Sequence, residues 1–148
     1  MHTLLHLTCL LVVLLGWVRC DLFDNPCRII PNGGHDEQTT IDVNATLGCH
    51  NGSLYWDYPR GGVRVHFHYK GLPMFKVCLK DGLGGDVFEI YDVTYNAQHA
   101  LPVTSDSPKE VCTSFHHSEV VILFQAPEIQ VYMGEVAYRI QPLYLPGL

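Results

Sequence analysis

The stretch Cys49-His-Asn-Gly-Ser-Leu-Tyr-Trp-Asp-Tyr-Pro-Arg-Gly-Gly-Val-Arg-Val-His-Phe-His-Tyr69 decides the fold, because its second half carries the clearest pattern in the chain. From Gly62 onward, apolar and polar side chains alternate. The apolar set is Val63, Val65, Phe67 and Tyr69, and the polar set is Arg64, His66, His68 and Lys70. Alternation with a period of two residues is typical of a half-buried β-strand. The segment is therefore predicted to be a strand of a layered β-structure.

Short apolar runs continue this pattern toward the C-terminus, at 74–79, 87–93, 120–124 and 136–140. Glycine and proline residues typical of turns separate them, and we find no amphipathic helix of convincing length and no internal repeat. The run at 120–124 has no polar member, which predicts a central strand covered on both faces. Residues 21–46 are rich in turn formers and are predicted to be an extended lead-in. This pattern predicts an all-β fold, an antiparallel two-sheet sandwich.

Residues 1–20 have the features of a secretory signal peptide, with an apolar core from Leu4 to Leu15 and a cleavage site after Cys20. The remaining residues, 21–148, suffice for one domain. The apolar core is shorter than a membrane-spanning helix requires, so we expect a secreted, extracellular protein without membrane insertion. Fifteen acidic against nine basic residues give a net charge of −6. This charge argues against nucleic acid as a partner and favours an extracellular or cell-surface protein, such as a receptor.

Four cysteines remain after the predicted cleavage: Cys27, Cys49, Cys78 and Cys112. An even number in a secreted chain predicts two disulfides. Of the three possible pairings we favour the sequential one, because it closes a moderate loop in each half, worth roughly 3 to 4 kcal/mol per disulfide. Cleavage after Gly16 would instead leave Cys20 as an odd thiol available for a covalent dimer.

Two acceptor sequences for N-glycosylation, Asn44-Ala-Thr46 and Asn51-Gly-Ser53, lie on either side of Cys49. They predict that this region is exposed and glycosylated at Asn44 and Asn51. The pair Asn51-Gly52 is also a typical hairpin turn, and a turn and a glycan are compatible.

The histidines at 66 and 68 share one strand face, as two metal ligands would. His116 and His117 could approach from another strand, but nothing in the sequence identifies the remaining ligands, so no metal site is predicted. We favour a partner-binding stripe formed by Arg64, His66, His68 and Lys70. Such a stripe would meet an acidic protein or a sulphated glycan and would bind more strongly as the histidines become protonated.

The acidic loop from Asp81 to Asp86, followed by Glu89 and Asp92, offers oxygen ligands for calcium. It lacks the spacing of an EF-hand, so a plain acidic turn is favoured and no cofactor is predicted. The chain has no Gly-x-Ser-x-Gly motif, and its cysteines are assigned to disulfides. Its glycines also lack the strand-to-helix setting of a phosphate-binding loop, so we expect no catalytic residues and no enzymatic activity.

Trp56 stands between Tyr55 and Tyr58 in an aromatic cluster. We expect Trp56 and one of these tyrosines to fill the core beside a disulfide, because aromatic burial makes a large packing contribution. The alternative is an exposed binding patch.

The order Gly52-Ser53, Trp56, Tyr58-Pro59 and Gly61, followed by the alternating strand and Val77-Cys78-Leu79, resembles the N-terminal domain of the meteorin family. The similarity continues to Gly134-x-x-x-Tyr-x-Ile140. It implies a CUB-like sandwich with two disulfides and a secreted signalling ligand. The netrin-like second domain of meteorins has no counterpart in these 148 residues, so activities resting on it do not transfer. Alternatives are a spermadhesin-like protein that binds glycans or gamete surfaces, and a metal-dependent enzyme built on the histidines.

Overall fold

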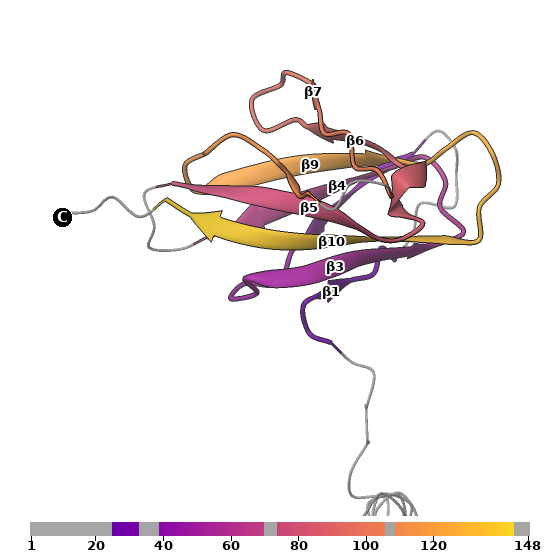
Figure 1. Ribbon diagram of the computed structural model, residues 1–148, viewed down its shortest axis with the longest axis horizontal. Helices are drawn as coiled ribbons and strands as arrows, with labels where there is room; N and C mark the ends of the chain where they lie inside the picture. The colour runs from indigo at the N-terminus through magenta and orange to yellow at the C-terminus, as the bar shows by residue number, and fades with distance from the viewer. Residues whose placement is uncertain (1–24, 33–38, 70–73, 106–108, 144–148) are drawn as a thin grey trace, which may run out of the picture.

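The computed structural model describes residues 25–32, 39–69, 74–105 and 109–143. The predicted signal peptide and Lys70 lie outside the described residues. The described chain forms two five-stranded sheets stacked face to face, with one three-residue 3₁₀ helix, η1 (Gly85–Val87) (Figure 1). The two sheets and two disulfides confirm the predicted sandwich.

The first sheet has the order β1-β3-β10-β5-β8, formed by Arg28–Ile29 (β1), Asn51–Asp57 (β3), Met133–Pro142 (β10), Phe75–Leu83 (β5) and Val111–Cys112 (β8). The second sheet has the order β2-β4-β9-β6-β7, formed by Thr40–Asn44 (β2), Gly62–His68 (β4), Glu119–Gln125 (β9), Glu89–Asp92 (β6) and His99–Ala100 (β7). Most neighbouring strands are antiparallel, but β1 pairs with β3 and β2 pairs with β4 in parallel. The parallel pairs lie at the sheet edges, so the body of each sheet is antiparallel, as predicted.

The core fills the space between the sheets with side chains that alternate inward along each strand. Trp56 is 0% exposed and stacks on Phe88, with ring centroids 5.8 Å apart. Burial of one large apolar side chain stabilises the fold by roughly 1.5 to 3 kcal/mol. The prediction for Trp56 is therefore confirmed. The prediction that Tyr55 or Tyr58 joins it is wrong, because Tyr55 is only half-buried and Tyr58 is exposed. Among the described residues, the buried tyrosine is Tyr138.

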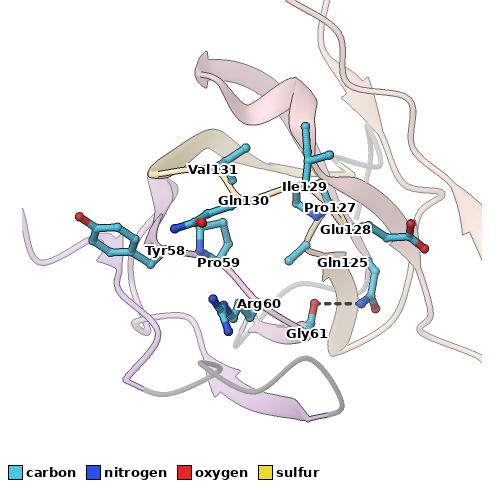
Figure 2. A pocket seen from close by; sticks show the side chains of 11 residues that line it. Tyr58, Pro59, Arg60, Gly61, Gln125, Pro127, Glu128, Ile129, Gln130 and Val131 are labelled. Atoms are coloured by element: carbon cyan, nitrogen blue, oxygen red, sulfur yellow. Dashed lines mark hydrogen bonds between the residues drawn. The ribbon is translucent and has the colours of Figure 1, made fainter.

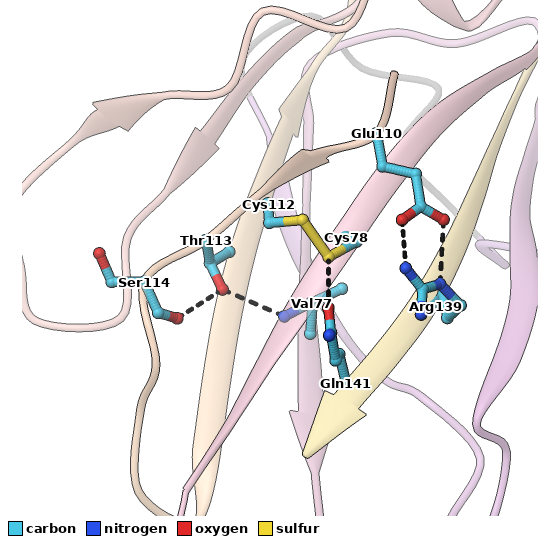
Figure 3. Close-up of a disulfide and its surroundings, with 8 residues drawn as sticks. All are labelled: Val77, Cys78, Glu110, Cys112, Thr113, Ser114, Arg139 and Gln141. Carbon is cyan, nitrogen blue, oxygen red and sulfur yellow. Dashed lines mark hydrogen bonds and ion pairs between the residues drawn. A yellow bond between two sulfur atoms is a disulfide. The ribbon is translucent and has the colours of Figure 1, made fainter. Parts of the chain in front are cut away.

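Cysteine pairing follows the sequential pattern, with bonds Cys27–Cys49 and Cys78–Cys112, as predicted. Cys78 and Cys112 are direct register partners, so the second bond fastens the two-residue edge strand β8 to β5 (Figure 3). Beside it, the hydroxyl of Thr113 accepts a hydrogen bond from the backbone N–H of Val77 at 3.1 Å. The bond therefore holds a strand too short to be stable through its own pairing.

The expected hairpin turn at Asn51-Gly52 is wrong, because both residues begin β3. The turn instead lies at Leu47 and Gly48, where Gly48 has a φ of 90°. Gly52 is needed for close approach: a Cβ there would lie 2.0 Å from the backbone oxygen of Cys27. The glycine that suggested a turn therefore lets β1 lie against β3.

Residues 21–46 contain more structure than the predicted lead-in, since β1 and β2 both fall within them. Ile41 and Val43 of β2 pack against the core, while Asp42 points outward. Two apolar residues are too few for a reliable alternation signal. Pairing along β4 supplies the hydrogen bonds that this short edge strand needs.

Candidate functional site

The predicted stripe lies on the outer face of the second sheet, where Arg64 and His68 of β4 are exposed and His66 is partly buried. Strand register brings two acidic residues to the same face. Glu119 of β9 is the direct partner of His68, and Asp42 of β2 is the direct partner of Arg64. The stripe is therefore flanked on both sides by carboxylates, a feature that period-2 alternation within one strand could not reveal.

His66 lies between the two carboxylates. Its Nδ1 is 2.9 Å from Glu119 Oε1, and its Nε2 is 2.9 Å from Asp42 Oδ1. Because ionised carboxylates only accept hydrogen bonds, the imidazole can donate to both of them only in its protonated, positively charged form. Arg64 lies 3.5 Å from the same Asp42 oxygen. Asp42 therefore links Arg64 and His66.

The surroundings of His66 act on its pKa in opposite directions. Burial lowers the pKa, while hydrogen bonds and charge interactions with Asp42 and Glu119 raise it, and the net effect is an increase above the ordinary histidine value. The positive charges of Arg64 and His66 are thus offset within the protein itself. An acidic partner would have to compete with Asp42 and Glu119.

His116 does not join this face. It is buried, and its Nε2 lies 2.9 Å from Asp92 Oδ2. The Oδ1 atom of Asp92 accepts hydrogen bonds from the backbone N–H and the hydroxyl of Thr94. The approach of His116 that was considered for a metal site therefore does not occur, because His116 pairs with Asp92 in the interior.

The acidic loop examined for calcium is divided among separate structural contacts. Asp81 accepts hydrogen bonds from the backbone N–H groups of Gly85 and Asp86 at 2.7 and 3.2 Å, while Glu89 accepts one from Tyr91. Among the described residues, no three carboxylates of this loop gather as possible metal ligands. The prediction of a plain turn is wrong, because Asp81 belongs to β5 and Asp86 to η1, and the Asp81 side chain joins the two elements.

A second surface lies at one end of the sandwich, between the β3–β4 turn and the loop that joins β9 to β10 (Figures 1 and 2). A hollow of about 490 Å³ opens between these loops. Three large side chains in and beside it are exposed: Tyr58 at 52%, Ile129 at 70% and Tyr132 at 75%. We call Tyr58, Ile129 and Tyr132 the end-loop surface. Figure 2 shows Tyr58 extending away from the other side chains that line the hollow.

The two loops are held together by their backbones. The N–H of Tyr58 donates to the carbonyl of Tyr132 at 2.8 Å, and the two rings meet edge to face at 6.0 Å. The carbonyl of Gly61 accepts from the backbone N–H of Ala126 at 2.8 Å and from the side chain of Gln125 at 2.9 Å (Figure 2). These bonds fix the end-loop surface to the sheets.

Backbone geometry at Tyr58 is unusual for its residue type. Its φ is 45°, in the left-handed region that costs a non-glycine residue roughly 1 to 2 kcal/mol. The neighbouring Gly61 has a φ of 68°, which glycine adopts without this cost. The chain therefore holds a large exposed ring in a conformation that does not favour it.

Both predicted glycosylation sites are exposed, Asn44 at the end of β2 and Asn51 at the start of β3. Asn44 is the register partner of His66. A glycan on Asn44 would therefore stand beside the stripe and limit the approach of a protein partner there. The end-loop surface contains neither sequon.

No protein-family model and no curated protein matches this chain. Among solved structures, it is similar to Aeromonas hydrophila PliG, a periplasmic inhibitor of g-type lysozyme, at 18% identity over 72% of this chain and 99% of that chain, with a TM-score of 0.43. Rat MASP-1 CUB1-EGF-CUB2 matches at 12% identity over 72% of this chain and 44% of that chain, with a TM-score of 0.42. Salmonella Typhimurium PliG matches at 10% identity over 72% of this chain and 99% of that chain, with a TM-score of 0.38. Scores this low carry no argument about function.

Proposed function

We propose that this chain is a secreted, non-enzymatic domain that binds an extracellular protein through the end-loop surface. The observation that carries the proposal is the exposure of Tyr58 and Tyr132, whose rings meet edge to face, with Ile129 exposed in the same loop as Tyr132. Surface residues of this size usually occur singly, whereas a grouped set indicates an interaction site. Tyrosine is also among the residues that most often dominate binding energy at protein interfaces.

The rigidity of the end-loop surface supports this proposal. Two backbone hydrogen bonds join the loops, and the tyrosine rings support one another edge to face. A preorganised surface loses little conformational entropy on binding, so more of its contact energy contributes to affinity. The stripe is a weaker candidate, because Asp42 and Glu119 already contact Arg64 and His66, respectively.

Several observations support an extracellular setting for this proposal. Two disulfides are typical of proteins that fold in oxidising compartments. Within the described ranges, no helix has the length and apolar character needed to cross a membrane. The sequons and the predicted signal peptide agree with secretion.

The meteorin resemblance is part of the same proposal. Its motif residues occupy positions that need their residue types: Trp56 fills the core, Pro59 is buried, and Gly61 has a positive φ. These structural roles account for the tryptophan, the proline and the final glycine of the W-x-Y-P-x-G pattern, whereas Tyr58 is exposed and has a positive φ. A meteorin-like signalling role therefore depends on the receptor experiment described next.

We would test the proposal with the glycosylated protein, produced in secretory cells and applied to an array of cells that each express one surface receptor. The expected result is saturable binding to a protein receptor that weakens when Tyr58 and Tyr132 are both replaced by alanine. Tyr95→Ala, which removes another exposed tyrosine, serves as the matched control. Binding only to glycan arrays, or equal binding by all variants, would contradict the proposal.

A further inference from the structure

We propose that His66, His68 and Glu119 form a binding site for a divalent transition-metal ion of the zinc class. Two imidazoles and one carboxylate are a ligand set that suits zinc. The inference concerns the stripe and does not depend on the proposed protein partner.

Strand register creates the site. His66 and His68 are two residues apart on β4, so both point to the outer face of the sheet. Glu119 is the direct antiparallel partner of His68, which places its carboxylate beside both rings. The third ligand therefore comes from a residue 51 positions later than His68, and only the fold brings it to the histidines.

The distances suit a shared ion. Glu119 Oε1 lies 2.9 Å from His66 Nδ1 and 3.6 Å from His68 Nε2, and the possible ligand atoms of the three residues all lie within 4.8 Å of one another. A tetrahedral zinc ion with bonds of about 2.0 to 2.2 Å separates its ligand atoms by about 3.4 Å. Small side-chain rotations are therefore enough to enclose the ion.

Asp42 supports this assignment independently. Its Oδ1 lies 2.9 Å from Nε2 of His66, the ring nitrogen opposite the one that faces Glu119. A carboxylate on the second nitrogen of a metal-binding histidine fixes the ring and increases its basicity, and such partners are usual at zinc sites. Arg64, 3.5 Å from the same oxygen, holds Asp42 in turn.

Accessibility also fits a metal site with an open position. The side chains of the three ligands are 26% to 41% exposed, so an ion reaches them from solvent. Three protein ligands leave the fourth position of a tetrahedral ion to water or to an incoming group. The other grouping of potential ligands in the described chain, Cys78, Glu110 and Cys112, is different, because its two sulfurs form a disulfide and offer no thiolate.

The test is isothermal titration of zinc chloride into the glycosylated protein, purified without a polyhistidine tag and freed of metal by dialysis against a chelator. We expect one zinc ion per chain. His68→Ala and Glu119→Gln should each weaken binding at least about tenfold, and Asp42→Asn should weaken it about 10- to 100-fold by removing the support for His66. Circular dichroism and a melting curve check that each variant is folded.

His99→Ala is the matched control, because it removes an exposed histidine from β7 of the same sheet and should leave zinc affinity unchanged. A second readout is the NMR spectrum of the imidazole nitrogens, in which zinc should shift the signals of His66 and His68 but not that of His99. The proposal is overturned if the wild type takes up no stoichiometric zinc, or if a folded His66→Ala/His68→Ala variant binds zinc as tightly as the wild type.

Discussion

The stripe and the end-loop surface both face solvent, but they differ in whether their side chains already have partners within the protein. In the described part of the stripe, Asp42 and Glu119 contact Arg64, His66 and His68, so these groups meet carboxylates within the protein. In the end-loop surface, Tyr58, Ile129 and Tyr132 are 52% to 75% exposed to solvent. A partner gains little by displacing existing ion pairs, whereas it gains burial energy by covering apolar side chains.

This difference is the reason for proposing separate roles for the two surfaces. The polar cluster suits a small ion that fits between side chains already in contact. The apolar end suits a macromolecule that covers a larger area. The W-x-Y-P-x-G motif contains both a buried and an exposed aromatic residue: Trp56 is buried, and Tyr58, two residues later, is exposed. Tyr58 lies just beyond the end of β3 at Asp57, so the alternation that buries Trp56 does not extend to it.

The largest expected effect comes from removing the core beneath both surfaces. Trp56→Ala should lower the free energy of unfolding by about 3 to 5 kcal/mol, because it leaves a large cavity beside Phe88. Urea unfolding measures this loss. Tyr55→Ala, on the outer face of the same strand, should cost much less. Equal losses for the two variants would show that the core is misplaced.

The second largest effect tests whether the end-loop surface can be loosened without changing the stripe. Gln125→Ala removes the side-chain hydrogen bond to the carbonyl of Gly61 and should cost about 1 kcal/mol. Hydrogen exchange should quicken at the loops around residues 58–62 and remain unchanged at His66. Glu128→Ala, an exposed neighbour, is the control. Faster hydrogen exchange at both surfaces would mean that the two surfaces do not open independently.

The parts of the fold that could be predicted from the sequence are those that leave a local pattern in it. Alternation predicted β4, and apolar runs predicted parts of β5, β6, β9 and β10, because burial on one face leaves a periodic pattern. The cysteine count and loop lengths predicted the two disulfides. The start of β3 was mistaken for a turn, since the tight contact of Gly52 with Cys27 is a tertiary requirement that looks like a turn signal.

The two surfaces were only partly predictable for the same reason. Arg64, His66 and His68 were found because they lie in one periodic strand. Asp42 and Glu119 were missed as their neighbours, since β2 and β9 come from distant parts of the chain. Tyr132 lies in an irregular loop with no pattern, and its contact with Tyr58 arises only from the fold.

A smaller effect tests the backbone conformation of Tyr58. Tyr58→Gly and Tyr58→Ala both remove the ring, but only glycine relieves the positive φ. We expect the glycine variant to be the more stable of the two by up to about 1 kcal/mol, because the relief of strain exceeds the entropy lost by glycine on folding. Thermal melting of the two variants measures the difference. A more stable alanine variant would show that Tyr58 is not strained.

The smallest effect concerns an ion pair outside both surfaces, Glu110 with Arg139 (Figure 3). The hydrogen bond from Arg139 lowers the pKa of Glu110, so its contribution to stability is present above pH 4.5 and disappears as the pH falls through the lowered pKa. The Tm of the wild type should therefore fall slightly more than the Tm of Glu110→Gln between about pH 5 and pH 3. Carboxylates titrate in about this range. An equal fall would mean that solvent screens the pair completely.

The most direct test of the division between the two surfaces is the affinity of two double variants for the receptor identified in the array. Tyr58→Ala/Tyr132→Ala should weaken binding at least about tenfold, as expected when interface tyrosines are truncated. Arg64→Ala/His68→Ala should bind within about twofold of the wild type, because its charges are offset by neighbouring carboxylates. The reverse result, with binding lost in the stripe variant and kept in the tyrosine variant, would contradict this assignment.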